Sequence, residues 1–143
     1  MLKQVNRHKE AKSLLRRTMP VARRVLGDSH DYTLTMRKVY AETLYKADGA
    51  SLDDLREAVT TLEDAGRIAR RVFGGAHPTT KYIEDILQKA RAALNARRNP
   101  ELRAAYKEDP SSLSADDRAR AEQLLARDAR KAAKKAARAS ESA

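Results

Sequence analysis

The clearest hydrophobic pattern in the chain lies between Ser51 and Phe73, where apolar or small residues recur in steps of three and four. These positions are Leu52, Leu55, Val59, Leu62, Gly66, Ala69 and Phe73. Such steps follow the turn of an α-helix and predict one amphipathic helix of about six turns. Ser51 is a favourable N-cap, and Asp53 and Asp54 place negative charge where the helix dipole favours it. Because Gly66 lowers helix propensity, we expect it to let a neighbouring helix approach closely.

Similar patterns on either side predict further helices joined by short loops. Residues 32–47 carry a second stripe, made of Met36, Val39, Tyr40, Thr43 and Leu44. Downstream, His77-Pro78 opens another helix, because a proline in the first turn of a helix removes no hydrogen bond. The stripe of that helix is Ile83, Ile86, Leu87, Ala90 and Leu94. The sequence thus predicts a succession of helices connected by short loops.

Prolines mark the expected breaks in these helices. Asn99-Pro100 resembles His77-Pro78 in placing a proline where a helix can begin, and it predicts a separate short helix. Asp109-Pro110 is expected to end that helix. Ser114 is then the N-cap of a long alanine-rich helix. Near the N-terminus, apolar residues keep helical spacing on both sides of Pro20, although a proline inside a helix costs about 3 kcal/mol. We therefore expect a kink or a break near Met19.

One short segment occurs almost twice in the chain. Residues 22–30 read ARRVLGDSH and residues 69–77 read ARRVFGGAH, so six of the nine positions are identical. The two copies are 47 residues apart. A spacing of this size is typical of a repeat built from a helical hairpin. The sequence therefore predicts two copies of the same joint between helices.

The loops in these copies read Leu26-Gly27-x-x-His30-Asp31-x-Thr33 and Phe73-Gly74-x-x-His77-Pro78-x-Thr80. The helices between them carry Tyr40-Ala41-x-x-Leu44-Tyr45-x-x-x-Gly49 and Leu55-x-x-Ala58-x-x-x-Leu62. Over about residues 10–95, these motifs resemble tetratricopeptide repeats of the kinesin light chain type, whose loop reads L-G-x-x-H-P-x-T. The first loop departs from the family in having aspartate where the family prefers proline. The repeat is also longer than usual, and the extra length falls in the loop at residues 47–54, where an insertion is well tolerated.

The resemblance implies an all-α fold: a short stack of antiparallel helical hairpins, a tetratricopeptide-like α-solenoid, with a C-terminal capping helix and a basic, alanine-rich helical tail. We place the repeat region at residues 1–98, the capping helices at residues 99–125, and the tail, exposed or bound to a partner, at residues 126–143. Arrays of this kind usually need three or more repeats, and about two are recognisable here. Either the terminal helices cap the stack or contact with another protein stabilises it. Residues expected to have structural roles in the loops are Gly27, His30, Thr33, Gly74, His77, Pro78 and Thr80.

The composition agrees with long, solvated helices. Of 143 residues, 35% are charged, and only five are glycine and four are proline. The net charge of +10 is concentrated at the two ends of the chain. The absence of cysteine excludes disulfides, thiolate metal sites and cysteine nucleophiles. No apolar run approaches the roughly 20 residues that span a bilayer. We expect a soluble, cytoplasmic protein, with organellar import through the basic N-terminal segment left open.

No motif predicts an enzyme, a metal site or a cofactor. His30 and His77 occupy equivalent loop positions, where a histidine caps a helix, and neither has a second metal ligand at i, i+4 spacing. The adjacent acids at 53–54, 84–85 and 116–117 fit helix capping and solvation better than acid–base catalysis. Gly74-Gly75 lacks the G-K-[ST] sequence that a phosphate-binding loop requires.

The resemblance to tetratricopeptide repeats implies protein binding, so we expect a non-enzymatic protein–protein interaction module, an adaptor or scaffold subunit of a larger assembly, whose inner groove holds an extended or helical segment of another protein. The candidate groove residues are Tyr45, Arg37, Lys38 and Tyr82. The alternative is a nucleic-acid-associated, ribonucleoprotein subunit that docks through its basic termini and does not stack on bases, because no aromatic residue is interleaved with those charges. The candidate phosphate contacts are Arg127, Arg130, Lys131, Lys134, Lys135 and Arg138. The formation of a homo-oligomer stays open.

Overall fold

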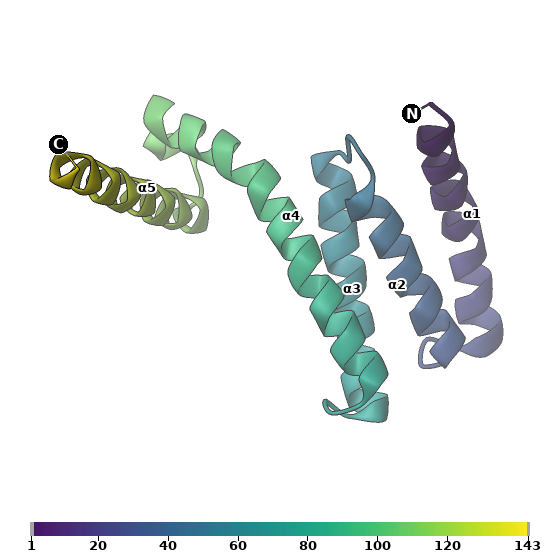
Figure 1. Cartoon of the computed structure of the whole chain (residues 1–143). Coiled ribbons are helices and arrows are strands. Elements are labelled where there is room, and N and C mark those ends of the chain that lie inside the picture. The colour runs from purple at the N-terminus through teal and green to yellow at the C-terminus, as the bar shows by residue number, and fades with distance from the viewer. Residues whose placement is uncertain (1, 143) are drawn as a thin grey trace. The chain divides into compact units, whose positions relative to one another are not determined.

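The computed structural model describes residues 2–142, which form helices joined by short loops (Figure 1). The helices are α1 (Leu2–Leu26), α2 (Asp31–Lys46), α3 (Leu52–Phe73), α4 (Pro78–Glu108), the short 3-10 helix η1 (Pro110–Ser112) and α5 (Ala115–Glu141). No strand occurs among the described residues, so the predicted all-α fold is confirmed. The chain divides into two compact units, and the division falls within α4, between Asn95 and Ala96. The boundaries predicted at residues 98 and 125 stay predictions.

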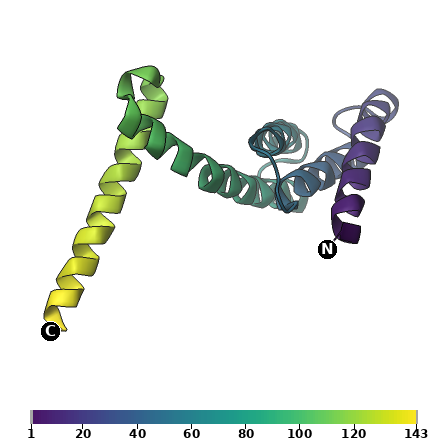
Figure 2. The same ribbon diagram turned by 90° about the horizontal axis from the view of Figure 1, so that it is seen from above.

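The N-terminal unit contains α1, α2, α3 and the first part of α4, and each helix runs in the opposite direction to the one before it (Figure 1). Seen from above, α2 lies between α1 and the pair formed by α3 and α4 (Figure 2). The core residues come from α2, α3 and α4, and Leu15 and Met19 of α1 pack against them. The buried core residues are Leu34, Tyr40, Ala41, Leu44, Ala58, Val59, Leu62, Ala65, Ala69, Ile83, Ile86, Leu87 and Ala90. The unit is the predicted stack of antiparallel hairpins.

Helix α3 forms as its sequence predicts. The hydroxyl of Ser51 accepts a hydrogen bond from the Asp54 N–H, and the Asp54 carboxylate accepts one from the Ser51 N–H, which completes a capping box. The residues buried along this helix include most of the predicted stripe. At Gly66, a Cβ atom would lie 3.6 Å from Cγ2 of Ile83, which is an ordinary van der Waals contact. The helices are therefore close at this point, but alanine would also fit.

The prolines do not break the helices in the way that the sequence suggested. Helix α4 continues through Pro100, so the prediction of a separate helix from Asn99 is wrong. Helix α1 also continues through Pro20, which excludes a break near Met19. Both prolines are exposed, as are Arg16 and Ala96, whose carbonyl groups lose the hydrogen bond from the residue four positions later. Water can solvate a carbonyl on the exposed side of a helix, which lowers the cost of the missing bond.

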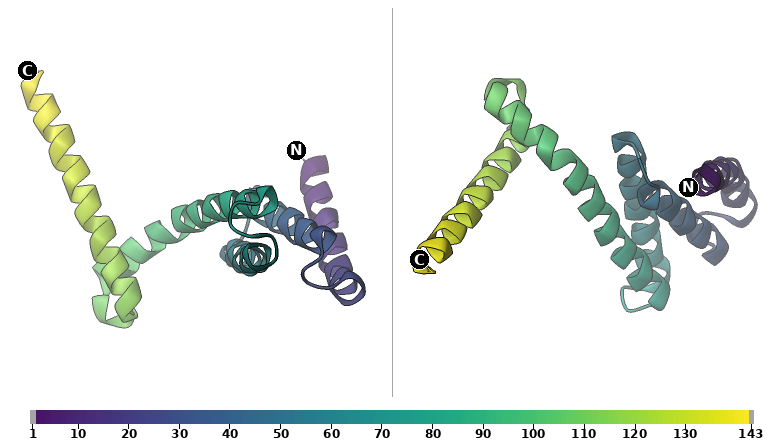
Figure 3. Two further views of the ribbon diagram at one scale, coloured as in Figure 1. Left: turned by 90° about the horizontal axis from the view of Figure 1, so that it is seen from below. Right: turned by 45° about the horizontal axis from the view of Figure 1, so that its top comes forward.

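The C-terminal unit is a helical hairpin formed by the end of α4, η1 and α5. Leu102, Ala121 and Leu124 are buried between the helices, and Tyr106 and Leu113 pack against them. Ion pairs from Arg98 to Asp117 and from Arg103 to Asp128 also join α4 to α5. Beyond residue 128, every described residue of α5 is exposed, and the helix extends past the packed part of the hairpin (Figure 3). The predicted tail is therefore helical and exposed.

Candidate partner-binding cleft

The two repeat loops have the same backbone conformation. Gly27 and Gly74 have φ angles of 89° and 85°, a region that glycine adopts at little cost. Each glycine N–H donates to the carbonyl oxygen four residues earlier, at 3.0 Å in both loops. Each glycine carbonyl accepts the N–H of the histidine three residues later, at 3.4 Å in both loops. The sequence copy is therefore also a structural copy.

The two histidines cap the helices that follow their loops. Nδ1 of His30 accepts the N–H of Tyr32, and Nδ1 of His77 accepts the N–H of Thr79, both at 3.2 Å. The His77 ring also stacks on Phe73, with ring centroids 4.6 Å apart. Thr33 and Thr80, in the first turns of α2 and α4, are almost completely buried. With Pro78 at the start of α4, the seven loop residues singled out in the sequence all lie in the joints between helices.

Arginines reinforce both joints through different acids. The guanidinium of Arg23 donates to the carboxylate of Asp28 within the first loop, and this hydrogen bond lowers the pKa of Asp28 below its ordinary value of 3.8. At the equivalent position in the second copy, Arg70 forms an ion pair with Glu84 of α4. In both joints, therefore, an arginine in the last turn of one helix pairs with an acidic residue that follows the end of that helix.

Because the joints are equivalent, α2 and α4 occupy equivalent places in successive hairpins. Their N-terminal turns border a cleft of about 340 Å³. The residues that line it are Leu34, Thr35, Lys38, Pro78, Thr79, Tyr82 and Ile83. A volume of this size lies at the lower end of the range for ligand-binding clefts in proteins. We refer to it as the α2–α4 cleft.

The α2–α4 cleft combines an apolar floor with a cationic and aromatic wall. Leu34 and Ile83 are buried and belong to the hydrophobic core. Tyr82 is 52% exposed, although it is a large aromatic residue. The Nζ atom of Lys38 lies 4.3 Å from the centroid of the Tyr82 ring, which is a cation–π contact. Lys38 and Tyr82, predicted as groove residues, are therefore brought together in one cleft.

Tyr45 lies further along the same face of α2, outside the residues that line the cleft. It is partly buried and packs against the core of the unit. Burial raises the pKa of Tyr45, and the charges of Lys46, Glu42, Lys89 and Asp85 also act on it. Since two of these charges belong to α4, the facing surfaces of α2 and α4 are close at this level too. Here the cations are neutralised by their own helices, through the pairs Lys46–Glu42 and Lys89–Asp85.

Arg37 does not line the cleft, contrary to its place among the predicted groove residues. The residue is only 7% exposed, and its guanidinium forms an ion pair with Asp64 of α3. Its Nη1 atom is buried without a hydrogen-bond partner among the described residues. Arg37 and Lys38 are consecutive residues, and a step of one residue turns a side chain by about 100° around a helix. Arg37 therefore faces α3, whereas Lys38 faces the cleft.

The sequence reasoning missed the apolar part of the cleft. Leu34, Thr35, Thr79 and Ile83 line it, and none of them was among the predicted groove residues. The available signal was the i, i+4 spacing that puts Leu34 on the same helix face as Lys38. A second i, i+4 pair, Pro78 and Tyr82, marks the facing side of the cleft.

A partly exposed hydrogen-bond network joins the first three helices. The Tyr40 hydroxyl of α2 donates to Glu57 of α3 and accepts a hydrogen bond from Arg16 of α1 at 3.0 Å. Arg16 also pairs with Glu57 at 2.9 Å. Burial raises the pKa of Tyr40, and the hydrogen bond to Glu57 raises it further. The network fixes the positions of α1, α2 and α3 and is structural in character.

Within residues 2–142, no group of three or more histidine, aspartate or glutamate side chains is placed to hold a metal ion. None of the helices described combines the length and apolar character that crossing a membrane requires. The six predicted phosphate contacts lie together on α5, where all of them are exposed.

A tetratricopeptide repeat family model matches residues 1–32 of the chain. The matched segment contains α1 and the first repeat loop, including Gly27 and His30. No curated protein matches the chain, and no solved structure does. The family match and the paired loop geometry together support a tetratricopeptide repeat in the N-terminal unit.

Proposed function

We propose that the chain is a non-enzymatic protein-interaction module, acting as an adaptor or scaffold subunit, and that the α2–α4 cleft binds an extended or helical segment of a partner protein. Tetratricopeptide repeats as a class suggest binding of proteins, which supports the general assignment. We choose this site because the Tyr82 side chain is about half exposed beside the apolar floor formed by Leu34 and Ile83.

The chemistry of the cleft favours a segment with an apolar side chain next to a hydrogen-bonding or acidic group. An apolar side chain would cover the floor and the ring of Tyr82. Covering about half of a tyrosine side chain removes on the order of 100 Å² from water, which corresponds to about 2–3 kcal/mol. A carboxylate would neutralise Lys38, whose cation–π contact already holds its ammonium group at the cleft. The side chains that would meet the partner are thus partly preorganised, which lowers the entropic cost of binding.

The kinesin light chain type of the repeat is a further part of the proposal. It is supported by the glycine-to-histidine loops, which occur twice with the same hydrogen bonds. The aspartate at position 31 is one departure from that family, and it begins α2 where Pro78 begins α4. Asp31 favours a helix start for a different reason, because its negative charge interacts with the positive end of the helix dipole. The departure therefore leaves the joint intact.

The test is selection of peptides from a phage-displayed random library on the immobilised full-length chain, followed by fluorescence anisotropy with the selected peptides. The double variant Lys38→Glu/Tyr82→Ala should bind these peptides at least about tenfold more weakly, because it removes both the cation and the ring of the cleft. The matched control is Tyr32→Ala/Lys81→Glu, which makes the same changes at exposed residues of the same two helices. The control should bind within about twofold of the original chain.

Two results would contradict the proposal. One is a selection that enriches no peptide on the chain over an empty support. The other is enrichment of peptides that bind the cleft variant and the control variant equally well. Circular dichroism of both variants establishes that each keeps the helical content of the original chain, so that a loss of binding is not a loss of fold.

The alternative function, association with nucleic acid, depends on a different part of the molecule. Its candidate contacts are on α5 in the C-terminal unit, and none of them lines the α2–α4 cleft. The two functions are therefore separable by substitution.

A further inference from the structure

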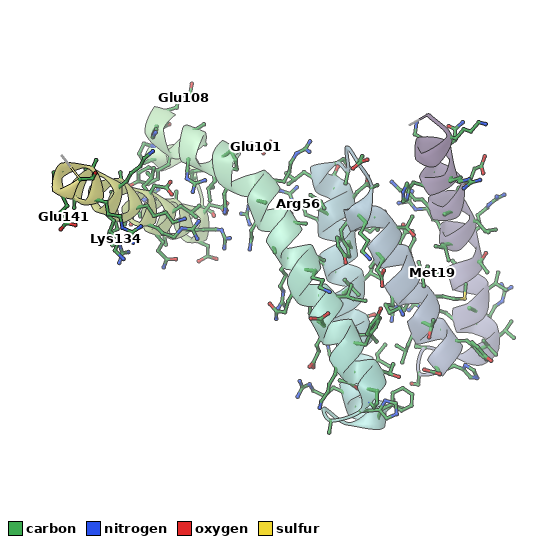
Figure 4. The ribbon with its side chains drawn as sticks, viewed as in Figure 1. Met19, Arg56, Glu101, Glu108, Lys134 and Glu141 are labelled. Carbon is green, nitrogen blue, oxygen red and sulfur yellow. The ribbon has the colours of Figure 1, made fainter. Side chains whose placement is uncertain are left out.

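The second half of α5 is a strongly charged, exposed surface of the described chain. From residue 129 to residue 142, every side chain is exposed. Figure 4 draws the side chains of this helix as sticks, with Lys134 and Glu141 labelled. From residue 127 onward, the basic residues of the helix are Arg127, Arg130, Lys131, Lys134, Lys135 and Arg138, and all of them are exposed.

The six cations lie on one side of the helix. Successive residues of an α-helix are turned by about 100°, so the six positions fall within an arc of about 140°. The other residues of the same turns are alanines, apart from Asp128. From Arg127 to Arg138 the stripe is about 16 Å long, at 1.5 Å of rise per residue. We call these six residues the basic stripe.

Almost no negative charge opposes the basic stripe. None of its members forms an ion pair with another described residue. The nearest acid in the chain, Asp128, is engaged by Arg103 of α4. Glu141 shares the side of the stripe but lies at the last turn of the helix, and Asp116 and Asp117 lie in the first turn, well before Arg127. Six like charges at this spacing repel one another, and a polyanion would relieve that repulsion.

We propose that the basic stripe binds the phosphate backbone of double-stranded nucleic acid without reading its base sequence. A duplex carries about one phosphate per 1.7 Å of its axis, so the length of the stripe faces roughly ten phosphates. The segment has no aromatic residue, since the last one in the chain is Tyr106, and binding of single strands depends largely on stacking of bases on aromatic rings. An alanine-rich helix is also slim, which favours close approach to a groove that admits an α-helix.

An anionic membrane fits this surface less well. Helices that lie in a membrane interface insert bulky apolar residues opposite their charged face. Opposite the basic stripe there are only alanine and serine side chains, which contribute little apolar area. Attraction to a membrane would therefore be electrostatic alone, whereas a duplex offers a higher density of charge along the line of the stripe.

The experiment measures binding of the full chain to a fluorescent 20-base-pair duplex by anisotropy between 50 and 200 mM salt. If four to six phosphates are neutralised, affinity should fall by about 10² to 10³-fold over this range. The test variant keeps the composition and net charge but exchanges neighbours, so that three cations move to the opposite side of the helix. Its substitutions are Lys131→Ala, Ala132→Lys, Lys135→Ala, Ala136→Lys, Arg138→Ala and Ala139→Arg. All six positions are exposed, so the exchange removes no packing.

The rearranged variant should bind the duplex at least about tenfold more weakly at 100 mM salt, with about half the salt dependence. Equal binding by the two chains would overturn the proposal, because charge alone would then explain it. Absence of binding to the duplex at 50 mM salt would overturn it as well. So would tighter binding to vesicles of anionic lipid than to the duplex. The cleft variant Lys38→Glu/Tyr82→Ala should retain the binding, which distinguishes this surface from the proposed protein-binding site.

Discussion

The same substitution, glycine to alanine, should have opposite effects at two positions of the N-terminal unit. Gly74 ends α3 with φ 85° and ψ 162°. This is a backbone region that residues other than glycine adopt only at a cost of about 1–3 kcal/mol. A Cβ atom at Gly74 would have no neighbour within 4 Å, so it would neither clash nor add a contact. Gly74→Ala should therefore lower the free energy of unfolding by about 1–3 kcal/mol, entirely through the backbone.

At Gly66 the backbone is helical and alanine is the preferred residue. The added Cβ would lie 3.6 Å from Cγ2 of Ile83, at an ordinary contact distance. Alanine in a helix interior is favoured over glycine by about 0.5–1 kcal/mol. Gly66→Ala should therefore raise the free energy of unfolding by about that amount. The two variants should differ by roughly 1.5–4 kcal/mol, although each adds only one methyl group.

Equilibrium unfolding in urea, followed by far-ultraviolet circular dichroism, measures these differences. Gly75→Ala is the matched control, because Gly75 is in the same loop, does not have a positive φ, and would contact only the flexible end of the Arg70 side chain. Its effect should be small. The reasoning is refuted if Gly74→Ala is as stable as Gly75→Ala, since the loop would not then need a positive φ. A destabilised Gly66→Ala variant would refute the packing of α3 against α4.

Three further substitutions test individual contacts. His77→Asn should keep most of the stability, since asparagine is also an N-cap residue, whereas His77→Ala should lose about 1 kcal/mol in thermal or urea unfolding. Tyr40→Phe should cost about 1 kcal/mol, because it removes one hydroxyl from a network in which Arg16 and Glu57 still pair. For Asp54, burial alone would raise the pKa, but hydrogen bonds and charge from Lys12 and the Ser51 N–H lower it below its ordinary 3.8. Its contribution to stability is therefore present above pH 3.8 and is lost as pH falls through the lower folded pKa. Asp54→Asn should flatten the dependence of the unfolding midpoint on pH between about 5 and 2.

The sequence predicted the parts of the fold that depend on local chemistry. The apolar stripe of α3, its Ser51 cap and the two loop glycines follow from rules that act within a few residues, and all are present in the structure. The paired loops were detectable because each makes a sharp turn between antiparallel helices and both use nearly the same residues.

The features that the sequence did not predict depend on how the helices pack against one another. Pro20 and Pro100 are local stop signals, but each is exposed in a helix whose other residues continue to pack or pair. Arg37 and Lys38 are adjacent cations in the sequence, and only the position of α3 shows that one is buried in an ion pair while the other faces a cleft. The floor of the cleft came from core residues, which periodicity assigns to packing and not to binding.

The N-terminal unit also shows how a short repeat array is held together by polar contacts across helices. Lys12 of α1 pairs with Asp54, while Arg91 of α4 pairs with Glu63 of α3. Both pairs are at least partly exposed, so each contributes little alone. The first pair joins α1 to α3 across the stack and the second joins α4 to α3, so both help to fix the register of the helices.

The most direct test of the proposed binding site is nuclear magnetic resonance of the isotope-labelled chain during titration with one of the selected peptides. The proposal predicts that the largest chemical-shift changes occur at Lys38 and Tyr82 and at their neighbours along the α2–α4 cleft. Changes concentrated on α5, or on the exposed outer surface of α1 and α3, with the cleft signals unmoved, would contradict it.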